Sequence, residues 1–145
     1  MNRPRTLLCL LLACDLVGCA IPRAATGMPK PLTVSPVMPF ADVPVPAAFV
    51  QDAARSFAFQ NEEVRVGLLR YTGRAEGARV IAFYREQMPA FQWTLANAVE
   101  AEPAILNFEK AGQSCIILVS RKGGRTELAI DVAPKSSRPR KLELH

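Results

Sequence analysis

Residues 115–132, with the sequence CIILVSRKGGRTELAIDV, indicate the fold more clearly than any other stretch of the chain. The first part, CIILVS, is apolar on both faces of an extended strand, which is typical of a strand at the centre of a sheet. The last part alternates, with Leu128, Ile130 and Val132 on one face and charged residues on the other. The glycine pair between the two parts supplies the positive φ angles of a tight hairpin. We therefore predict an antiparallel sheet with this hairpin inside it.

Four further segments have the composition of short strands. They cover residues 56–60, 63–71, 93–99 and 104–109. The first places Phe57 and Phe59 on one face, and the second repeats apolar residues at period two, namely Val64, Val66 and Leu68. Asn61 and Glu62 suit the turn between these two strands.

The segment 75–88 has the pattern of an amphipathic helix, and Pro89 should end it. One stripe of the helix is apolar, with Phe83 beside it; the stripe consists of Val80, Ile81, Tyr84, Met88 and Phe91. The predicted order is therefore β-β-α-β-β-β-β, an α+β fold in which one helix packs on one face of an antiparallel sheet. We expect this single domain to span residues 47–134.

The two flanks of the domain differ from it in composition. Residues 19–46 contain seven of the twelve prolines of the chain, so we expect an extended, semi-stiff tether. Residues 135–145 form a basic tail without apolar clustering, which predicts disorder. Its cations, which could contact an anionic surface, are Lys135, Arg138, Arg140 and Lys141.

The first eighteen residues of this 145-residue chain read as a signal peptide. Arg3 and Arg5 precede the apolar run LLCLLLA, residues 7–13, and small residues follow. The run is shorter than the roughly 20 apolar residues that a membrane-spanning helix needs. We therefore expect residues 1–18 to be removed and the mature body to be soluble.

The sequence Leu16-Val17-Gly18-Cys19 resembles the lipobox of bacterial lipoproteins. That resemblance implies acylation of Cys19, cleavage before it, and anchoring through acyl chains, each buried CH₂ of which contributes about 0.8 kcal/mol. Cys14 also fits the box after a shorter signal. Acylation of Cys14 would place Asp15 next to the lipid, which in Gram-negative lipoproteins implies retention in the inner membrane. Cys19 is followed by Ala20, which implies the periplasmic side of the outer membrane.

Recognisable catalytic chemistry is absent from the sequence. The only histidine is His145, the last residue, and the chain contains no Walker A, G-x-G-x-x-G, H-E-x-x-H or G-x-S-x-G motif. Glu100 and Glu102 lie in an expected loop and read as solvated carboxylates rather than an acid–base pair, as do the adjacent Glu62 and Glu63. We expect no cofactor, no metal site and no enzymatic activity.

Two features of the predicted core could have had other roles. Tyr84, Phe91 and Trp93 could line a ligand pocket between helix and sheet, but such aromatic side chains more often fill a core. Cys115 reads as a buried strand residue with an inert thiol. The arginines are spread along the chain and not interleaved with aromatic residues, so we expect no nucleic acid as partner.

The body of the chain is similar to a pattern found in small uncharacterised bacterial lipoproteins. A strand ends in Tyr-x-Gly, a helix carries Phe-Tyr, and a tryptophan opens the next strand; here these are Tyr71, Gly73, Phe83, Tyr84 and Trp93. The resemblance covers most of residues 47–134 and implies an α+β domain but no particular activity. We expect a monomeric, membrane-anchored interaction or accessory module of the envelope, with small-ligand binding as the alternative.

Overall fold

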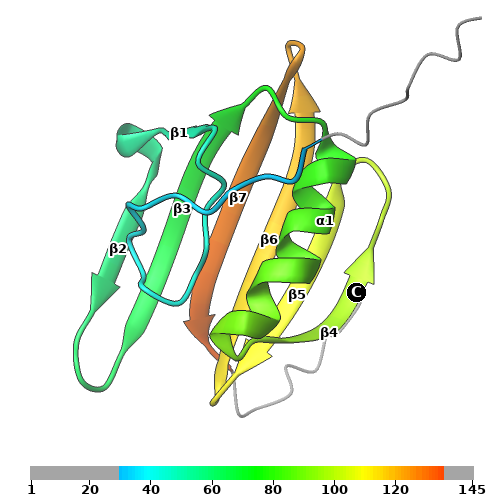
Figure 1. The fold of residues 1–145 in the computed structure, drawn as a ribbon. Helices are drawn as coiled ribbons and strands as arrows, with labels where there is room; N and C mark the ends of the chain where they lie inside the picture. Colours follow the sequence, from blue (N-terminus) through cyan, green and yellow to red (C-terminus); the bar gives the residue numbers. More distant parts are fainter. Residues whose placement is uncertain (1–29, 136–145) are drawn as a thin grey trace, which may run out of the picture.

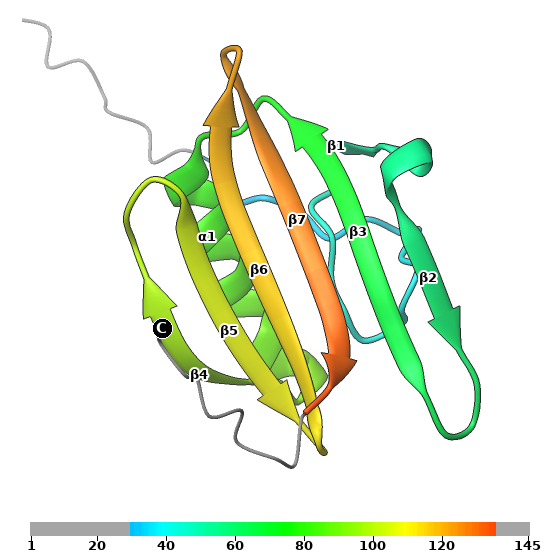
Figure 2. The ribbon, with the colours of Figure 1, turned by 180° about the vertical axis from the view of Figure 1, so that it is seen from behind.

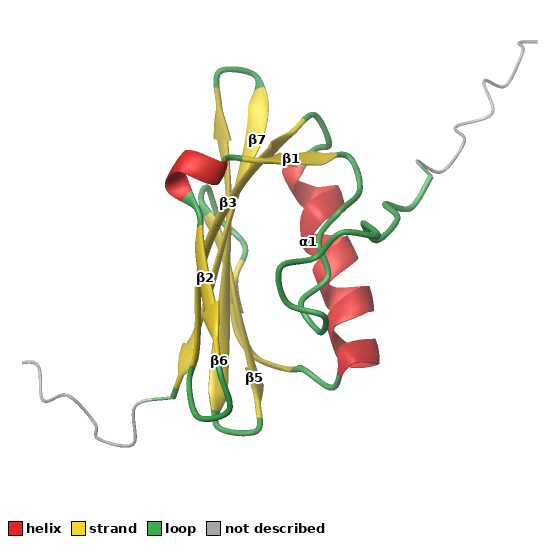
Figure 3. Ribbon diagram, turned by 90° about the vertical axis from the view of Figure 1, so that its left-hand side faces the viewer, coloured by secondary structure: helices red, strands yellow, loops and turns green. Residues whose placement is uncertain are grey.

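The computed structural model describes residues 30–135; segments 1–29 and 136–145 lie outside this description. Within the described residues, one antiparallel sheet carries helix α1 (Gly77–Gln87) on one face, which confirms the predicted α+β fold (Figures 1 and 3). The strands are β1 (Phe49–Gln51), β2 (Phe57–Gln60), β3 (Arg65–Gly73), β4 (Thr94–Val99), β5 (Ala104–Lys110), β6 (Gln113–Lys122) and β7 (Arg125–Pro134). Two short 3-10 helices, η1 (Ala53–Arg55) and η2 (Met88–Phe91), complete the elements.

The strand order is β1-β3-β7-β6-β5-β4, and β2 also pairs with β3. β6 lies between β7 and β5, as its two apolar faces predict. Gly123 (φ 56°) and Gly124 (φ 77°) form the turn between β6 and β7, so the predicted hairpin is confirmed. A second hairpin of the same kind, at Ala111 and Gly112, joins β5 to β6.

The core lies between α1 and the sheet. Val80 and Tyr84 of the predicted stripe are buried on the helix, and so is Phe83, which was predicted to lie beside the stripe, whereas Ile81 is only partly buried. Facing them is a row of paired side chains, at most 1% exposed, from four neighbouring strands: Leu69, Ile130, Ile117 and Leu106. Full burial of each such aliphatic side chain contributes about 1.5–3 kcal/mol, so this row is a main source of the stability of the fold.

The end of α1 turns the chain sharply into the sheet. Gln92 adopts φ 68°, in the left-handed region that favours glycine, and the Trp93 N–H donates to the Met88 carbonyl at 3.1 Å. This turn directs the Trp93 side chain, 1% exposed, into the core.

In strand β3 the residues that point into the core are not the ones that the alternation of Val64, Val66 and Leu68 suggests. Leu68 is 45% exposed on the face away from α1, whereas Leu69 and Tyr71 point into the core. The remaining inward positions of β3 are Arg65, Gly67 and Gly73. The period-two pattern of apolar residues therefore marked the outer face of this strand.

Residues 30–46 correct the predicted tether, because they pack against the domain. Phe40, Val43 and Val45 are at most 2% exposed and belong to the hydrophobic core. A Cβ atom on Gly67 would lie 2.7 Å from Cζ of Phe40, so the missing side chain of Gly67 makes room for the ring. The folded unit thus begins before residue 47, and residues 19–29 of the predicted tether lie outside the described residues.

Asp42 fastens this segment to the domain. Its carboxylate accepts hydrogen bonds from Lys110 Nζ at 2.7 Å and Arg65 Nη1 at 3.1 Å, and its carbonyl accepts one from Trp93 Nε1 at 2.8 Å. Burial opposes ionisation of Asp42, but the hydrogen bonds from Arg65 and Lys110 outweigh it and lower its pKa below the usual 3.8. The Arg65 guanidinium also lies 4.5 Å from the centre of the Phe40 ring.

Candidate functional site

The sheet face opposite α1, here called the outer face, has no further layer over it among residues 30–135 (Figures 2 and 3). Its register follows from the strand pairing, because paired residues point to the same side. One row across the sheet runs Phe57, Leu68, Asp131, Ile116 and Asn107. The neighbouring row runs Arg70, Ala129, Leu118 and Ile105.

Large apolar side chains on the outer face are exposed to a degree that core-facing residues are not. Phe57 is 57% exposed, Phe59 48% and Ile116 42%. We call the following set the outer apolar patch: Phe57, Phe59, Leu68, Ile105 and Ile116. Several large apolar side chains exposed on one sheet face typically mark an interaction site, because leaving them in water is unfavourable.

One ion pair lies in the middle of the outer apolar patch. Arg70 Nη1 is 2.5 Å from Asp131 Oδ1, and their side chains are 31% and 41% exposed. An exposed pair of this kind contributes about 0–1 kcal/mol to stability. Its larger effect is to leave the centre of the face without net charge.

Two hollows open on the outer face beside the patch. One, of about 370 Å³, is lined by residues that include Ser114, Ile116 and Asp131. The other, of about 160 Å³, is lined by residues that include Arg70 and Leu118. The face therefore carries one depression beside Ile116 and another beside Arg70.

The aromatic residues that the sequence offered as a pocket lining lie in or against the core. Tyr84 is 0% and Trp93 1% exposed, and Phe91 packs against the core from its edge. Burial raises the pKa of the Tyr84 phenol well above 10. A ligand in the space between helix and sheet would have to displace these side chains, which fill it themselves.

An open apolar groove lies on the other side of the molecule, between α1 and the start of the described chain. Its volume is about 410 Å³, and its lining includes the apolar residues Leu32, Ala82 and Phe83 as well as Glu76 and Glu86. The lining suits a hydrophobic side chain.

The carboxylates considered as an acid–base pair are engaged separately. Glu100 pairs with Arg85, and Glu102 Oε1 accepts a hydrogen bond from the Arg121 N–H at 2.8 Å. Glu62 and Glu63 are exposed in the turn before β3. Within residues 30–135, no group of three or more His, Cys, Asp or Glu side chains is placed to hold a metal ion.

The remaining residues singled out from the sequence divide by location. Cys115 is 0% exposed, and burial raises the pKa of its thiol to about 12. Lys135 pairs with Glu109 at 2.7 Å, whereas the other tail cations, Arg138, Arg140 and Lys141, lie outside the described residues. Cys14 and Cys19 lie outside them too.

Sequence reasoning missed the outer apolar patch, although it placed Phe57 and Phe59 on one face. The available signal was the exposed alternation in β3 together with Ile116 in a strand apolar on both faces. In the described part of the chain, no helix is long and apolar enough to cross a membrane. No protein-family model matches the chain, and neither does any curated protein or solved structure.

Proposed function

We propose that this chain is a lipid-anchored protein of the bacterial cell envelope that acts as a non-enzymatic interaction module. Cys19 carries the acyl chains and holds the domain on the periplasmic side of the outer membrane, and the outer apolar patch binds another protein. The observation that carries the binding role is the exposure of Phe57, Phe59 and Ile116, between 42% and 57%, on a sheet face without a covering layer in residues 30–135.

The charge of the outer face favours a protein over a membrane surface or a polyanion. Arg70 is paired with Asp131, Glu109 with Lys135, and Lys122 lies 3.9 Å from Glu127. Binding to phosphates depends on cations that are free to pair with them. The centre of the face, where Arg70 and Asp131 pair, suits the central part of a protein–protein interface, where charged residues are depleted; the cations Lys122 and Arg125 lie at one end of the face.

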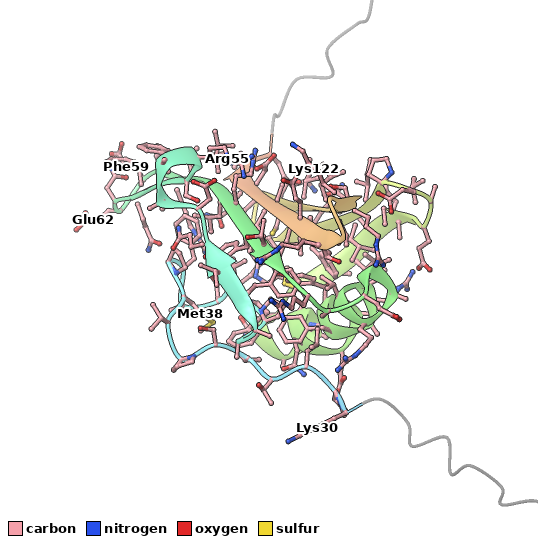
Figure 4. The ribbon with its side chains drawn as sticks, turned by 90° about the horizontal axis from the view of Figure 1, so that it is seen from above. Lys30, Met38, Arg55, Phe59, Glu62 and Lys122 are labelled. Carbon is pink, nitrogen blue, oxygen red and sulfur yellow. The ribbon has the colours of Figure 1, made fainter. Side chains whose placement is uncertain are left out.

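The position of the N-terminal segment is compatible with anchoring and binding at once. Lys30, the first described residue, lies on the side of α1, whereas Phe59 lies on the opposite side of the sheet (Figure 4). The described chain therefore begins on the side away from the outer face. An anchor attached from that side leaves the outer face accessible.

Cysteine labelling in isolated envelope membranes tests the binding role without knowledge of the partner. Ile116→Cys places a thiol in the patch, and Val37→Cys places one on an exposed residue, 78% accessible, in the segment that packs on the α1 side. Cys115 gives little background because it is buried. We expect a maleimide to modify Val37→Cys readily and Ile116→Cys much more slowly, and to modify both after unfolding in urea. Equal modification in folded membrane samples would contradict a covered outer face.

A further inference from the structure

We propose that the partner of the outer face is a second copy of this chain, so that two copies pack outer face to outer face around a two-fold axis. This proposal rests on the function proposed above and replaces the monomer expected from the sequence. It is carried by three independent properties of the outer face: its area, its charge arrangement and its relief.

The area of the outer face matches what a specific interface needs. Strands β2, β3, β7, β6 and β5 contribute five adjacent positions to the face. At about 4.8 Å between strands and 3.3 Å per residue, the 40 residues of these strands present a surface of about 630 Å² per copy, at the lower end of the range for specific interfaces. Specific interfaces bury about 800 Å² per partner, and two sheets pack face to face about 10 Å apart in sandwich folds.

The charges at the centre of the face are complementary to themselves. Each copy presents one cation, Arg70, and one anion, Asp131, side by side on neighbouring strands β3 and β7. A two-fold axis that passes between them brings Arg70 of one copy toward Asp131 of the other, twice over. A closed two-fold dimer requires a self-complementary patch of this kind.

The shape of the outer face is also suited to contact with a second copy, because it has both exposed aromatic rings and a hollow. Phe57 and Phe59 are about half exposed on β2 at one side of the face, and the hollow of about 370 Å³ beside Ile116 lies toward the other side. In a two-fold arrangement, the exposed rings of each copy face the hollowed half of the other. Buried aromatic side chains that fill hollows are the contacts that dominate the energy of most interfaces.

Anchoring makes such an interface effective even when the affinity in solution is modest. Two lipidated copies share one membrane, which raises their effective concentration. Ten residues separate Cys19 from Lys30. Fully extended, they span about 35 Å. That reach allows both copies to remain anchored although their N-terminal segments leave from opposite sides of the dimer.

Photo-crosslinking of the full-length chain in its own membranes tests this proposal. A photoreactive benzoylphenylalanine replaces Ile116 in one strain and Val37 in a matched control strain. We expect a crosslinked species of twice the monomer mass from the Ile116 position, containing peptides of this chain only, and none from the Val37 position. A crosslink from Ile116 to a different protein overturns the dimer but keeps the proposed function. No crosslink from Ile116 contradicts both.

Charge exchange tests the two-fold geometry. Arg70→Asp leaves only negative charge at the centre of the face, and Asp131→Arg leaves only positive charge. We expect each variant alone to lose the crosslinked dimer, and co-expression of the two variants to restore it as a mixed dimer of differently tagged chains. Both residues are partly exposed, so both variants should fold. Wild-type crosslinking by the single variants, or failure of co-expression to restore it, overturns the proposed pairing.

Discussion

Replacement of Phe40 by alanine should show that the folded unit begins well before residue 47. The ring is 2% exposed and lies over Gly67, where no side chain competes for the space. Truncation of a buried phenylalanine costs about 3–5 kcal/mol through lost burial and the cavity left behind. The loss of the ring beside the Arg65 guanidinium acts in the same direction. A domain of this size is stable by about 5–15 kcal/mol, so the change is a large fraction of the total.

Urea unfolding of the purified chain, followed by the fluorescence of its single tryptophan, measures this effect. Trp93 is a direct reporter because its Nε1 donates to the carbonyl of Asp42 in the same segment. With an m-value of about 2 kcal/mol per M, the midpoint should fall by roughly 2 M. Val37→Ala, at a 78% exposed position nearby, is the control and should change stability by less than about 0.5 kcal/mol.

A double-mutant cycle measures the coupling between Phe40 and Gly67 directly. Gly67→Ala alone should destabilise the protein, because its Cβ atom would meet the Phe40 ring. In the Phe40→Ala background the same change should cost almost nothing, since the obstructing ring is gone. If Phe40→Ala costs less than about 1 kcal/mol, or if the two changes are additive, the segment is not packed on β3 as described.

Two further predictions concern buried and half-buried titratable groups. The folded pKa of Asp42 lies below its unfolded value of 3.8, so the ionised carboxylate stabilises the fold above that value, and this contribution is lost as the pH falls through the folded pKa. The difference in urea stability between wild type and Asp42→Asn should therefore be present at pH 7 and shrink under acid conditions. A difference that grows with acidity would contradict the ion-pair assignment. Cys115, with burial raising its pKa to about 12, should resist thiol reagents in the folded chain, and Cys115→Ser should cost about 1–3 kcal/mol in urea unfolding; rapid labelling of the native protein would contradict its burial.

The order of elements followed from local sequence signals, except that the short strand β1 before the two predicted N-terminal strands was not predicted. The glycine pair at 123–124, the alternation in β7 and the stripe of α1 each specify their own structure through turn geometry or side-chain period. These signals are local, and no distant segment alters them in the fold. The same holds for Trp93, whose size and place after the helix indicate burial.

The packing of residues 30–46 against the domain could not be predicted from local sequence signals. Prolines in that segment exclude helix and favour extension, but extension is compatible with lying along a domain as well as leading away from it. The deciding contacts are long-range: Phe40 over Gly67, and Asp42 with Lys110. The sequence did not show which face of β3 points into the core for the same reason. The space at its inward residues Gly67 and Gly73 is occupied by the rings of Phe40 and Phe49, which come from other segments.

The outer apolar patch was only half visible in the sequence. An apolar residue in a central strand predicts burial on either face, so Ile116 gave no sign that one face of the sheet lacks a covering layer within residues 30–135. That property depends on the number of helices and on the side they occupy. Because residues 30–135 provide one α-helix for one wide sheet, they leave one face of the sheet open.

The mass of the N-terminal peptide, measured from separated inner and outer membranes, tests the central claim of a lipid-anchored envelope module most directly. We predict a peptide that begins at Cys19, carries two or three acyl chains, and is recovered from the outer membrane. A peptide acylated at Cys14 and recovered from the inner membrane would contradict the assignment of Cys19. An unmodified N-terminus in the soluble fraction would contradict the anchored module altogether.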